Sequence, residues 1–464
     1  MYTLSMEQPS HLHFIGIGGV SMSGLAAILL DKGFTISGSD THETDLTQKL
    51  EAAGAHIAYE QVAENITDDI DAVIYTAAIH PSNPEYAAAV EKNLTLVTRA
   101  DLLGEMMKHY RIPICVSGTH GKTTTTSMAA HVLMAADLDP TISVGGVLPL
   151  IDGNYRIGGT DAFLMEACEY TNSFLSFFPK IGIILDIDAD HLDFFKDLED
   201  IRNSFRKFAE LIPEDGTLII NADDPACKMI CRDLRCRVLT YSALGGKADY
   251  TADLVTYNAC GNATFRALRS GEELGSFSLS VPGQHNVANA LAVIALGDAL
   301  GLSPEVIRDG FASFHGTHRR FEEKGKLGDV TIIDDYAHHP TEIRATLRTA
   351  QKVPHKTIWC VFQPHTYTRT KALLPQFAEA LAIADKVIVA DIYAARELDI
   401  YGISSEDLAE EVRKLGTDCL YLPSFAAIED HLRANAKDGD LIITMGAGNI
   451  VQVGEHLLDG KDPA

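Results

Sequence analysis

Residues 116–126, VSGTHGKTTTT, have the types and spacing that could bind the phosphates of a nucleotide. Gly118 and Gly121 permit a tight turn of backbone N–H groups, Lys122 adds a cation, and Thr123 adds a hydroxyl for Mg²⁺. The usual phosphate loop has four residues between its first glycine and its Gly-Lys pair, whereas this one has two. A polar helix cap is the alternative, but it explains neither the Gly-Lys-Thr order nor the β-branched run 123–126. The stretch predicts a shortened phosphate-binding loop.

Two acid-rich stretches could supply oxygen ligands for a nucleotide-bound Mg²⁺. Each follows an apolar run that predicts a strand, and loops at the carboxyl ends of parallel strands form the ligand crevice of an open sheet. We expect one or two of these side chains to bind the metal, and the rest to belong to a solvated loop. The candidates are Glu166 and Glu169 in LMEACEY, and Asp186, Asp188, Asp190, His191 and Asp193 in LDIDADHLDFF.

A second glycine turn lies near the N-terminus, in HFIGIGGVSMSG. Its residues Gly16, Gly18 and Gly19 come where a strand gives way to a helix, which is a favourable place for a phosphate. Asp40 ends the next predicted strand, where dinucleotide folds place a ribose-binding acid. Ser21 replaces the third glycine of the dinucleotide pattern. The turn predicts a nucleotide or sugar-phosphate site, with a merely tight turn as the alternative.

Three successive segments of alternating strands and helices must position these residues. The first runs to about residue 110, the second restarts the strand–glycine–helix pattern at ICVSGTHGKT, and the third begins near residue 318. Such alternation predicts parallel sheets covered by helices on both faces. The chain of 464 residues is long enough for two to four domains, and each segment has the size of one.

Composition narrows the class of protein. The formal net charge of −26 argues against wrapping nucleic acid, which requires a broad basic surface. No run of about 18 apolar residues predicts a membrane span, and the polar start MYTLSMEQPS does not resemble a signal peptide. The spacing of the eight cysteines does not match paired zinc ligands. These features predict a cytoplasmic enzyme with small-molecule substrates.

Seven motifs, in order over nearly the whole chain, together resemble the Mur ligase family of peptidoglycan biosynthesis. In this family the phosphate loop has the form G-T-x-G-K-[ST], which accounts for the short loop. The motifs are HFIGIGGVSMSGLA, GTHGKTTTT, EACEYTNSFL, HNVANALA, HRRFE, DDYAHHPTE and FQPHTYTRT.

The resemblance implies an α/β protein of three domains and a ligase activity. It implies a Rossmann-like domain for UDP-sugar over residues 1–110, a central P-loop ATPase domain with a mainly parallel sheet over 111–317, and a Rossmann-like domain over 318–464 that closes on the site. Within the family the motifs look like the branch that joins L-alanine to the lactyl carboxylate of UDP-N-acetylmuramate. The implied cofactors are ATP and Mg²⁺, the reaction passes through an acyl phosphate, and a monomer or homodimer is expected.

The resemblance also implies roles for particular residues. Lys122, Glu166, His191, His338 and Arg369 would be catalytic, and Thr123, Glu166 and His191 would serve the metal. ATP would contact Gly118, Thr119, His120, Gly121, Lys122, Thr123, Thr124, His285, Asn289, Arg320 and Asp335. The UDP-sugar would contact Gly16, Gly18, Gly19, Ser39, Asp40, Thr76, Ala77, Ala78 and Ile79.

Several of these residues also allow plainer interpretations. His338 and His339 precede a proline and could cap a helix, Arg320 could be a solvated linker charge, and Asn289 an ordinary polar helix residue. The chain also departs from the family at Thr366, where some members carry a second arginine.

Three other functions stay open at this point. A sister ligase that attaches a tripeptide to the same sugar would share the ATP site. An NAD(P)-dependent oxidoreductase would use the first glycine turn and Asp40, but would leave the Gly-Lys-Thr motif unexplained. A nucleotide-sensing module would bind without catalysis.

Overall fold

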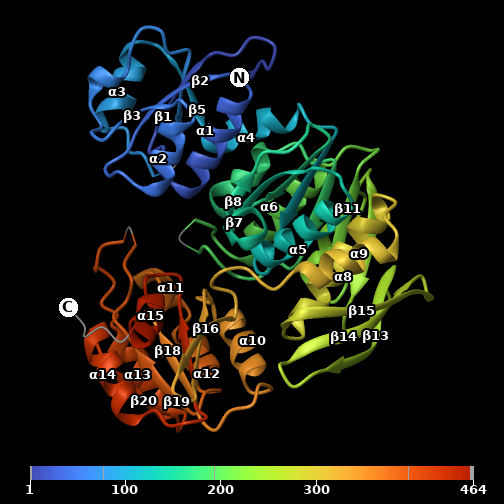
Figure 1. Ribbon diagram of the computed structural model, residues 1–464, viewed down its shortest axis with the longest axis vertical. Coiled ribbons are helices and arrows are strands. Elements are labelled where there is room, and N and C mark those ends of the chain that lie inside the picture. Colours follow the sequence, from blue (N-terminus) through green and yellow to red (C-terminus); the bar gives the residue numbers. More distant parts are fainter. Residues whose placement is uncertain (1–2, 77, 193, 396, 460–464) are drawn as a thin grey trace.

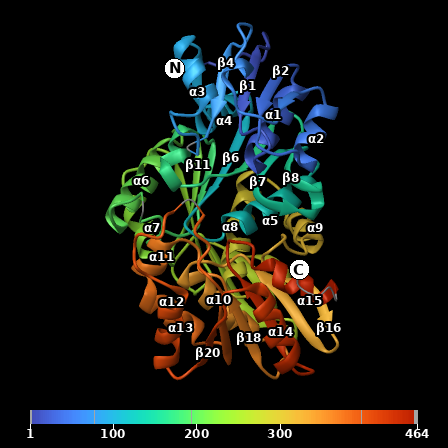
Figure 2. The same cartoon turned by 90° about the vertical axis from the view of Figure 1, so that its left-hand side faces the viewer.

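The chain folds around three β-sheets that follow one another in sequence. The computed structural model describes residues 3–76, 78–192, 194–395 and 397–459. The segment holding the central sheet lies between the N-terminal and C-terminal segments, so the molecule runs from one end to the other in the order of the sequence (Figure 2). None of the described helices has the length and apolar character needed to cross a membrane.

The N-terminal sheet is entirely parallel and has the order β3-β2-β1-β4-β5 (Figure 1). This is the doubly wound order of nucleotide-binding folds, as the strand–helix alternation predicts. Its ligand crevice is therefore expected where the order reverses, beside β1. The strands are β1 (His11–Ile15), β2 (Thr35–Ser39), β3 (His56–Ala58), β4 (Ala72–Tyr75) and β5 (Thr95–Thr98), and the helices are α1 (Val20–Asp31), α2 (Asp45–Ala52), α3 (Pro84–Glu91) and α4 (Arg99–Met107), with a short 3₁₀ helix η1 (Ala63–Asn65).

The central sheet has ten strands, with a parallel middle and antiparallel edges. Its order is β15-β14-β13-β12-β11-β10-β6-β9-β7-β8, and among the described pairings only the β13–β15 ribbon and the β7–β8 pair are antiparallel. The strands are β6 (Ile112–Ser117), β7 (Thr141–Leu148), β8 (Gly153–Arg156), β9 (Ala162–Glu166), β10 (Ile181–Ile184), β11 (Thr217–Asn221), β12 (Arg237–Ser242), β13 (Tyr250–Tyr257), β14 (Asn262–Arg269) and β15 (Glu272–Pro282). The helices are α5 (Lys122–Ala135), α6 (Leu198–Glu210), α7 (Pro225–Ile230), α8 (His285–Ala299) and α9 (Pro304–Ser313), with 3₁₀ helices η2 (Pro149–Ile151) and η3 (Tyr170–Ser176).

The C-terminal sheet has the order β16-β17-β21-β18-β19-β20, and of these described strands only β16 is antiparallel to its neighbour. Residues 367–381 form two helices, because the backbone breaks at Leu373 and Pro375 lies in the first turn of the second. The strands are β16 (Glu322–Leu327), β17 (Val330–Asp335), β18 (Ile358–Phe362), β19 (Lys386–Val389), β20 (Asp418–Tyr421) and β21 (Leu441–Met445), and the helices are α10 (Pro340–Ala350), α11 (Tyr367–Ala372), α12 (Leu374–Leu381), α13 (Ser405–Lys414), α14 (Phe425–Asn435) and α15 (Val451–Asp459).

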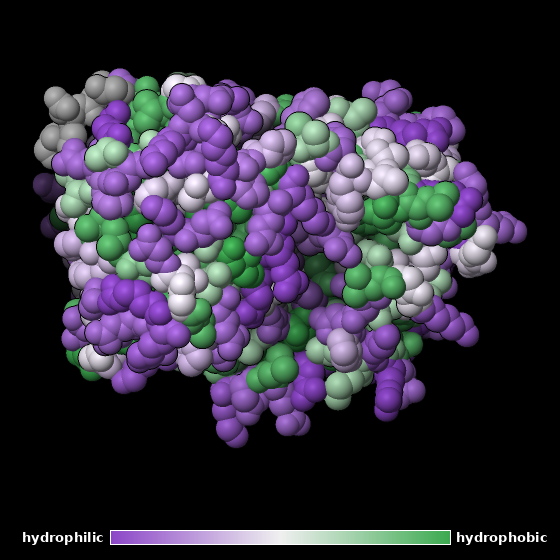
Figure 3. Space-filling model, turned by 90° about the horizontal axis from the view of Figure 1, so that it is seen from below, coloured by the Kyte–Doolittle hydropathy of each residue, from purple (hydrophilic) through white to green (hydrophobic). Residues whose placement is uncertain are grey.

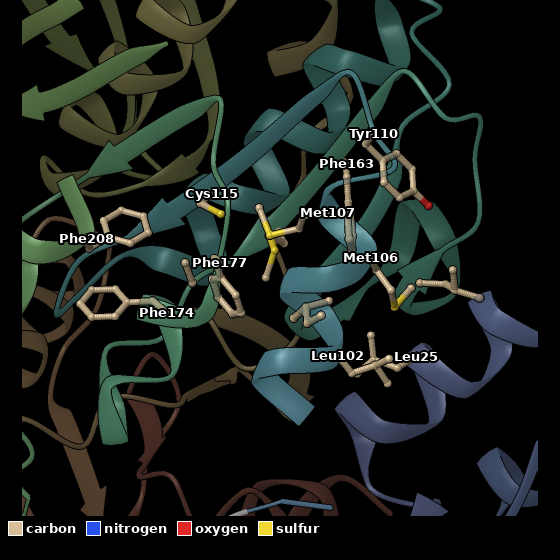
Figure 4. Close-up of a cluster of buried hydrophobic side chains, with 14 of the residues drawn as sticks. Leu25, Leu102, Met106, Met107, Tyr110, Cys115, Phe163, Phe174, Phe177 and Phe208 are labelled. Carbon is tan, nitrogen blue, oxygen red and sulfur yellow. The ribbon is translucent and has the colours of Figure 1, made fainter. Parts of the chain in front are cut away.

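Helix α4 joins the N-terminal and central segments through a shared hydrophobic core (Figure 4). Leu102 of α4 lies beside Leu25 of α1, while Met107 faces the aromatic side chains of the central segment. All of these side chains are buried, so the two segments pack as one body at this junction. The boundaries expected at residues 110 and 317 fall between the sheets, and we propose them as domain limits.

The order of strands in the central sheet brings the expected catalytic loops together. Strand β6 lies between β10 and β9, and all three are parallel. Their carboxyl ends therefore meet at one edge, where the phosphate loop follows β6, the EACEY loop follows β9, and the DADH loop follows β10.

Candidate active site

The phosphate loop connects β6 to α5 and is shaped by two glycines. Gly118 has φ +144° and Gly121 has φ +80°, which are backbone conformations that side chains with a Cβ rarely adopt. Lys122 is the first residue of α5, and its ammonium group bends back to donate to the carbonyl oxygens of Gly118 (2.6 Å) and Thr119 (3.0 Å). The loop therefore holds a cation at the N-terminus of a helix, where anions bind favourably.

Lys122 forms a buried ion pair with Glu169 of the EACEY loop. Its Nζ lies 3.0 Å from Glu169 Oε2 and 3.3 Å from Oε1. Burial alone would lower the pKa of Lys122, but the adjacent Glu169 carboxylate outweighs it and raises that pKa above its usual range. Lys122 is therefore a fixed cation, and an entering phosphate would compete with Glu169 for it.

Thr123 and Glu166 form a second pair of polar groups beside the lysine. Thr123 Oγ1 donates to the Glu166 carboxylate at 3.0 and 3.1 Å, and the N–H of Gly145 donates to Glu166 Oε2 at 2.8 Å. Arg320, from the connection to the C-terminal sheet, donates to Thr123 Oγ1 at 3.3 Å. A hydroxyl and a carboxylate are the hard oxygen donors that Mg²⁺ prefers, so these two residues fit the expected metal.

His191 lies next to Glu169, the carboxylate that pairs with Lys122. Its Nε2 is 3.7 Å from Glu169 Oε1, and its ring packs at a tilt of 34° against the ring of Tyr170, with 4.6 Å between centroids. The backbone of His191 is left-handed, with φ +54°. The structure thus pairs Thr123 with Glu166 and His191 with Glu169. Glu169, a candidate ligand from the sequence to which the family resemblance gives no role, therefore belongs to this cluster.

A cavity of about 230 Å³ lies between the phosphate loop, α8 and the C-terminal segment. Seen from below, the predominantly hydrophilic surface is hollowed near its middle, and hydrophobic residues are visible in the recess (Figure 3). Of the residues expected at ATP, the cavity is lined by His120, Gly121, Thr124, His285, Asn289, Arg320 and Asp335. Gly118, Thr119, Lys122 and Thr123 lie in the adjoining loop and the first turn of α5.

Burial shifts the pKa values of two side chains that line the cavity, His285 and Asp335. Burial lowers the pKa of His285 to about 4, so this side chain is neutral at neutral pH. Burial raises the pKa of Asp335 to about 6, while the nearby Arg320 opposes that rise. Asp335 accepts backbone N–H groups from Phe321 (2.9 Å) and Ala337 (2.7 Å). Arg320 also lies 5.1 Å from the ring of Tyr336 and contacts Thr123, so it is not the solvated linker charge considered from the sequence.

His120 of the phosphate loop contacts the C-terminal segment. Its Nε2 is 3.3 Å from Asp188 Oδ2, and its Nδ1 is 3.4 Å from Glu342 Oε1 of α10. Burial opposes protonation, but Asp186, Asp188 and Glu342 raise the pKa of His120 well above its usual value. His120 is therefore a cation that connects the phosphate loop to α10.

Among the residues that the structure describes, one further trio could hold a metal on distance alone. His120, Asp188 and His339 each offer one donor atom, and these atoms lie within 4.8 Å of one another. Both ring nitrogens of His120 already face carboxylates, and His339 Nδ1 accepts the N–H of Thr341 at 3.3 Å. We therefore explain the trio as a hydrogen-bonded contact between the central and C-terminal segments. His339 is the N-cap of α10, which confirms the alternative that it caps a helix.

Arg369 of α11 reaches the DADH loop of the central segment. Its Nε and Nη2 donate to Asp190 Oδ1 at 3.1 and 3.0 Å, and its Nη1 lies 3.1 Å from His365 Nδ1. Burial opposes ionisation of Asp190, but Arg369 holds the pKa of that carboxyl below its usual range. Beside this pair lies a small cavity of about 100 Å³, bounded by residues 189–192 and by α11.

His338 lies near this pair but is held by its own segment. Its ring is 3.4 Å from Glu342 Oε2 and 5.8 Å, between centroids, from the ring of His365. Burial lowers the pKa of His338 to about 4, so it is a neutral imidazole at neutral pH.

The residues expected at the UDP-sugar gather at the carboxyl edge of the N-terminal sheet. The N–H of Gly18 donates to Asp40 Oδ2 at 2.8 Å, and the N–H of Gly16 donates to the carbonyl of Ser39. Ser39 itself is fully buried and donates its hydroxyl to Glu85, so it supports the turn from within.

The neighbouring turn after β4 lies at the same edge. Its Thr76 hydroxyl accepts the N–H of Ala78 at 3.2 Å, and its carbonyl accepts that of Ile79 at 3.0 Å. Ala77 lies outside the described residues.

Comparison with known proteins places these features in one family. Three family models match the chain in order: "Mur ligase family, catalytic domain" over residues 11–111, "Mur ligase middle domain" over 116–297 and "Mur ligase, glutamate ligase domain" over 319–448. Curated UDP-N-acetylmuramate–L-alanine ligases from Lachnospira eligens and Agathobacter rectalis are each 55% identical over 458 residues, covering 99% of this chain and 100% of theirs.

Solved structures show the same likeness. The UDP-N-acetylmuramate–alanine ligase of Thermotoga maritima has a TM-score of 0.81 and 30% identity, covering 97% of this chain and 98% of that one. A murein peptide ligase from Psychrobacter arcticus has a TM-score of 0.71 and 25% identity over the same shares of the two chains.

Proposed function

The chain belongs to the Mur ligase family, and from this premise we propose that it joins L-alanine to the lactyl carboxylate of UDP-N-acetylmuramate, with ATP converted to ADP and phosphate. The enzyme is then a ligase of peptidoglycan biosynthesis. Full-length relatives at 55% identity bear the name of this activity. The observation that carries the proposal within the structure is the meeting of Lys122, Thr123 and Glu166 at the carboxyl ends of the adjacent strands β6 and β9.

The ATP is proposed to occupy the cavity of about 230 Å³, with its phosphates on the loop between Gly118 and Lys122. His285 and Asn289 would contact the adenine end, because both belong to α8 and line the cavity. Arg320 and Asp335 bring the C-terminal segment to the same ligand. Residues from two segments would therefore close around one nucleotide.

The reaction needs activation because a carboxylate has no adequate leaving group. A carboxylate oxygen of the sugar attacks the γ-phosphorus of ATP, the bond to the β,γ-bridging oxygen breaks, and ADP leaves. The alanine amine then attacks the acyl carbon, loses a proton, and expels inorganic phosphate carrying the former carboxylate oxygen. Positioning and charge stabilisation carry such transfers, so Lys122 and the N–H groups at the start of α5 would stabilise the charge on the moving phosphoryl group.

Thr123 and Glu166 are the proposed holders of Mg²⁺, with His191 and Glu169 close by. A bound Mg²⁺ would neutralise the charge on the nucleotide phosphates. The hydrogen bond from Gly145 fixes the Glu166 carboxylate in place. Such outer partners orient metal ligands and are part of the site.

The small cavity beside Arg369 is the proposed place of L-alanine. A guanidinium matches the carboxylate of an amino acid, and the apolar walls Leu192, Ala372 and Leu373 leave little room for a longer side chain. The UDP end is proposed to lie at Gly16, Gly18, Gly19 and Asp40. A monomer or homodimer in the cytoplasm stays our expectation.

Turnover of the purified protein with ATP, Mg²⁺ and UDP-N-acetylmuramate tests the proposal. Phosphate release should depend on L-alanine and should be far weaker with the tripeptide L-alanyl-γ-D-glutamyl-meso-diaminopimelate. Preference for the tripeptide would assign the chain to the sister activity instead. Phosphate release independent of any amino substrate would contradict a ligase.

A further inference from the structure

A chain of polar side chains runs along one face of the N-terminal sheet, from the solvent to the core. It begins at the exposed carboxylate of Asp69 and ends at Glu85 of α3, whose side chain is fully buried. Between them lie His11 and His13 of β1 and Ser37 of β2, on one face because His13 and Ser37 are in register. The faces of a parallel sheet are ordinarily apolar where helices cover them, so this buried polar chain departs from the rule.

Each side chain of the polar chain contacts the next. His11 Nδ1 lies 2.9 Å from Asp69 Oδ2, and His11 Nε2 lies 2.8 Å from Ser37 Oγ. Ser37 Oγ lies 2.9 Å from His13 Nδ1, and His13 Nε2 lies 3.6 Å from Glu85 Oε1. The last distance suits an ion pair rather than a hydrogen bond, and within the described residues His13 Nε2 is buried without a hydrogen-bond partner.

These four contacts require one proton more than the neutral side chains hold. Both ends of the polar chain are carboxylates, which only accept, so each contact needs its own proton. Two neutral imidazoles supply one proton each, and the serine hydroxyl supplies the third. With both histidines neutral, one contact must therefore join two acceptors. A fourth proton turns one histidine into an imidazolium and satisfies every contact.

The buried end of the polar chain is where that proton is needed most. Glu85 Oε2 accepts the hydroxyl of Ser39 at 2.5 Å and Oε1 accepts the amide of Asn65 at 2.6 Å, but neither donor is charged. Within the described part of the chain, the only ion pair of Glu85 is the one with His13. A fully buried carboxylate without a counter-ion is strongly destabilising. The extra proton is therefore held most favourably on His13 Nε2.

The other charged groups around the polar chain do not replace that proton. Lys92, which follows α3, donates instead to Asp68 at 2.8 Å. Asp71, next to the start of β4, accepts the backbone N–H of His11 at 2.8 Å and adds a further negative charge. The surroundings therefore favour a positive charge on the histidines.

Glu85 connects the polar chain to the glycine turn through Ser39. The Ser39 hydroxyl donates to Glu85, while the Ser39 carbonyl accepts the N–H groups of Gly16 (2.8 Å) and Ile17 (2.9 Å). Asp40 of the ligand crevice is the next residue. Ser39 is thus held between α3 and the turn, and a change at Glu85 is passed to both.

We propose that the polar chain takes up one proton from the solvent, and that this proton, held on His13 opposite Glu85, couples binding of the UDP-sugar to pH. Imidazole is the side chain that changes its charge near neutral pH. As the pH rises and the proton leaves, Glu85 loses its counter-ion, its hold on Ser39 weakens, and affinity for the sugar falls. His13 and Glu85 are positioning residues. The coupling to the UDP-sugar rests on the proposed function, whereas the proton count does not.

Affinity measured against pH tests the coupling. Dissociation constants for UDP-N-acetylmuramate are determined by titration calorimetry on full-length wild type and Glu85→Gln, between about pH 6 and about pH 8.5. The diphosphate of this ligand is esterified at both ends and keeps its charge over the range. Wild-type affinity should fall by about 10-fold as the pH rises. In Glu85→Gln an amide N–H supplies the fourth proton permanently, so affinity should stay near the low-pH value of wild type throughout.

Two further variants complete the comparison. His13→Leu leaves Glu85 unpaired at every pH, so it should bind about 10-fold more weakly than low-pH wild type and should unfold at a lower temperature. His13→Leu/Glu85→Gln should regain unfolding temperature, because the unpaired carboxylate is gone. His56→Gln is the control, since His56 is an exposed histidine on β3 of the same sheet, and it should keep the pH dependence of wild type.

Thermal unfolding without ligand tests the proton itself. Folding gives His13 a partner, so the contribution of the pair to stability is present at low pH and is lost as the pH rises. The unfolding temperature of wild type should therefore fall relative to that of Glu85→Gln between about pH 6 and about pH 8.5.

Three results would overturn the proposal. The first is a difference in unfolding temperature between wild type and Glu85→Gln that is constant with pH. The second is a pH dependence of affinity that is the same in these two proteins. The third is His13→Leu that binds like wild type. Wild-type protein that binds no UDP-sugar, but shows the expected unfolding behaviour, would instead contradict the proposed function, so the two failures are distinguishable.

Discussion

Arg369 Nη2 lies 3.0 Å from Asp190 Oδ1, and this ion pair joins α11 of the C-terminal segment to the loop that carries His191. The same guanidinium borders the small cavity assigned to L-alanine. The Arg369 side chain therefore contacts both the central segment and the proposed L-alanine site. We call the Arg369–Asp190 ion pair a clamp, because such a contact can position a substrate before the chemical step.

The clamp predicts a defined kinetic change in Arg369→Lys. A lysine keeps the charge but loses the paired donors, so kcat/KM for L-alanine should fall by about 10- to 100-fold while KM for ATP changes little. Arg348→Lys is the control, because Arg348 is exposed on α10. Steady-state kinetics with varied L-alanine check the expectation. An equal fall in kcat/KM for L-alanine and for ATP would show that Arg369 supports the fold and does not bind the amino acid.

Lys122 is predicted to act on the transferring phosphoryl group. Lys122→Met should lower kcat by about 100-fold or more, corresponding to roughly 3 kcal/mol of lost charge stabilisation. This variant also leaves the Glu169 carboxylate buried without its partner, which destabilises the protein.

The double variant Lys122→Met/Glu169→Gln separates the loss of catalysis from the loss of stability. Its unfolding temperature should be higher than that of Lys122→Met, because no buried carboxylate is left unpaired. It should stay inactive, because no cation faces the phosphate. Near-normal kcat in Lys122→Met would contradict the assigned role.

His285 is predicted to contribute to ATP binding and not to chemistry. His285→Ala should raise KM for ATP by about 10-fold with kcat nearly unchanged, because a uniform binding contact is removed. With a pKa of about 4 this imidazole is neutral from pH 6 to 8. The ratio of wild-type to variant KM should therefore be constant over that range, and a ratio that varies with pH would show that a charged histidine is involved.

The raised pKa of Asp335 predicts that the stability of the protein depends on pH. Its pKa is about 6 in the folded protein and about 3.8 when unfolded, so the folded state holds the proton more tightly. Its contribution to stability is therefore fully present below about pH 3.8 and is lost as the pH rises through about 6, by at most about 3 kcal/mol.

The variant Asp335→Asn lacks this titration. Its unfolding temperature, measured without nucleotide, should rise relative to wild type between pH 4.5 and 7. Asp186, whose pKa burial also raises to about 6, is present in both proteins and cancels in the comparison. If the difference in unfolding temperature between the two proteins does not change with pH, the raised pKa of Asp335 is contradicted.

The parallel core was predictable because its signals are local. The apolar strand and glycine turn around Gly118 predict a strand, a loop and a helix, and the structure places β6 and α5 there. The parallel pairing of β1 to β5 likewise follows from alternating strands and helices at the N-terminus. Both the three-part α/β architecture and the family are confirmed.

The antiparallel parts were missed because their strands are partly exposed and carry no long apolar run. One local signal was available: Ser270 and Gly271, both with positive φ, form the two-residue turn between β14 and β15. A Ser-Gly pair between alternating residues could have predicted this hairpin.

The charge partners within the site were not predictable from sequence. Glu169 and Lys122 are 47 positions apart, and Arg369 and Asp190 are 179 apart, so only the folded chain shows that they meet. The same holds for Ser39 and Glu85, which are 46 positions apart. Motifs indicate which residue types are present, whereas the packing of segments decides which charges are paired and which are left for a ligand.

Oxygen tracing tests the central claim most directly. UDP-N-acetylmuramate carrying ¹⁸O in its lactyl carboxylate is incubated with enzyme, ATP, Mg²⁺ and L-alanine, and the released phosphate is analysed by mass spectrometry. Activation through an acyl phosphate predicts one ¹⁸O atom in each phosphate released from fully labelled sugar. Phosphate free of ¹⁸O, formed in step with the amide product, would contradict it.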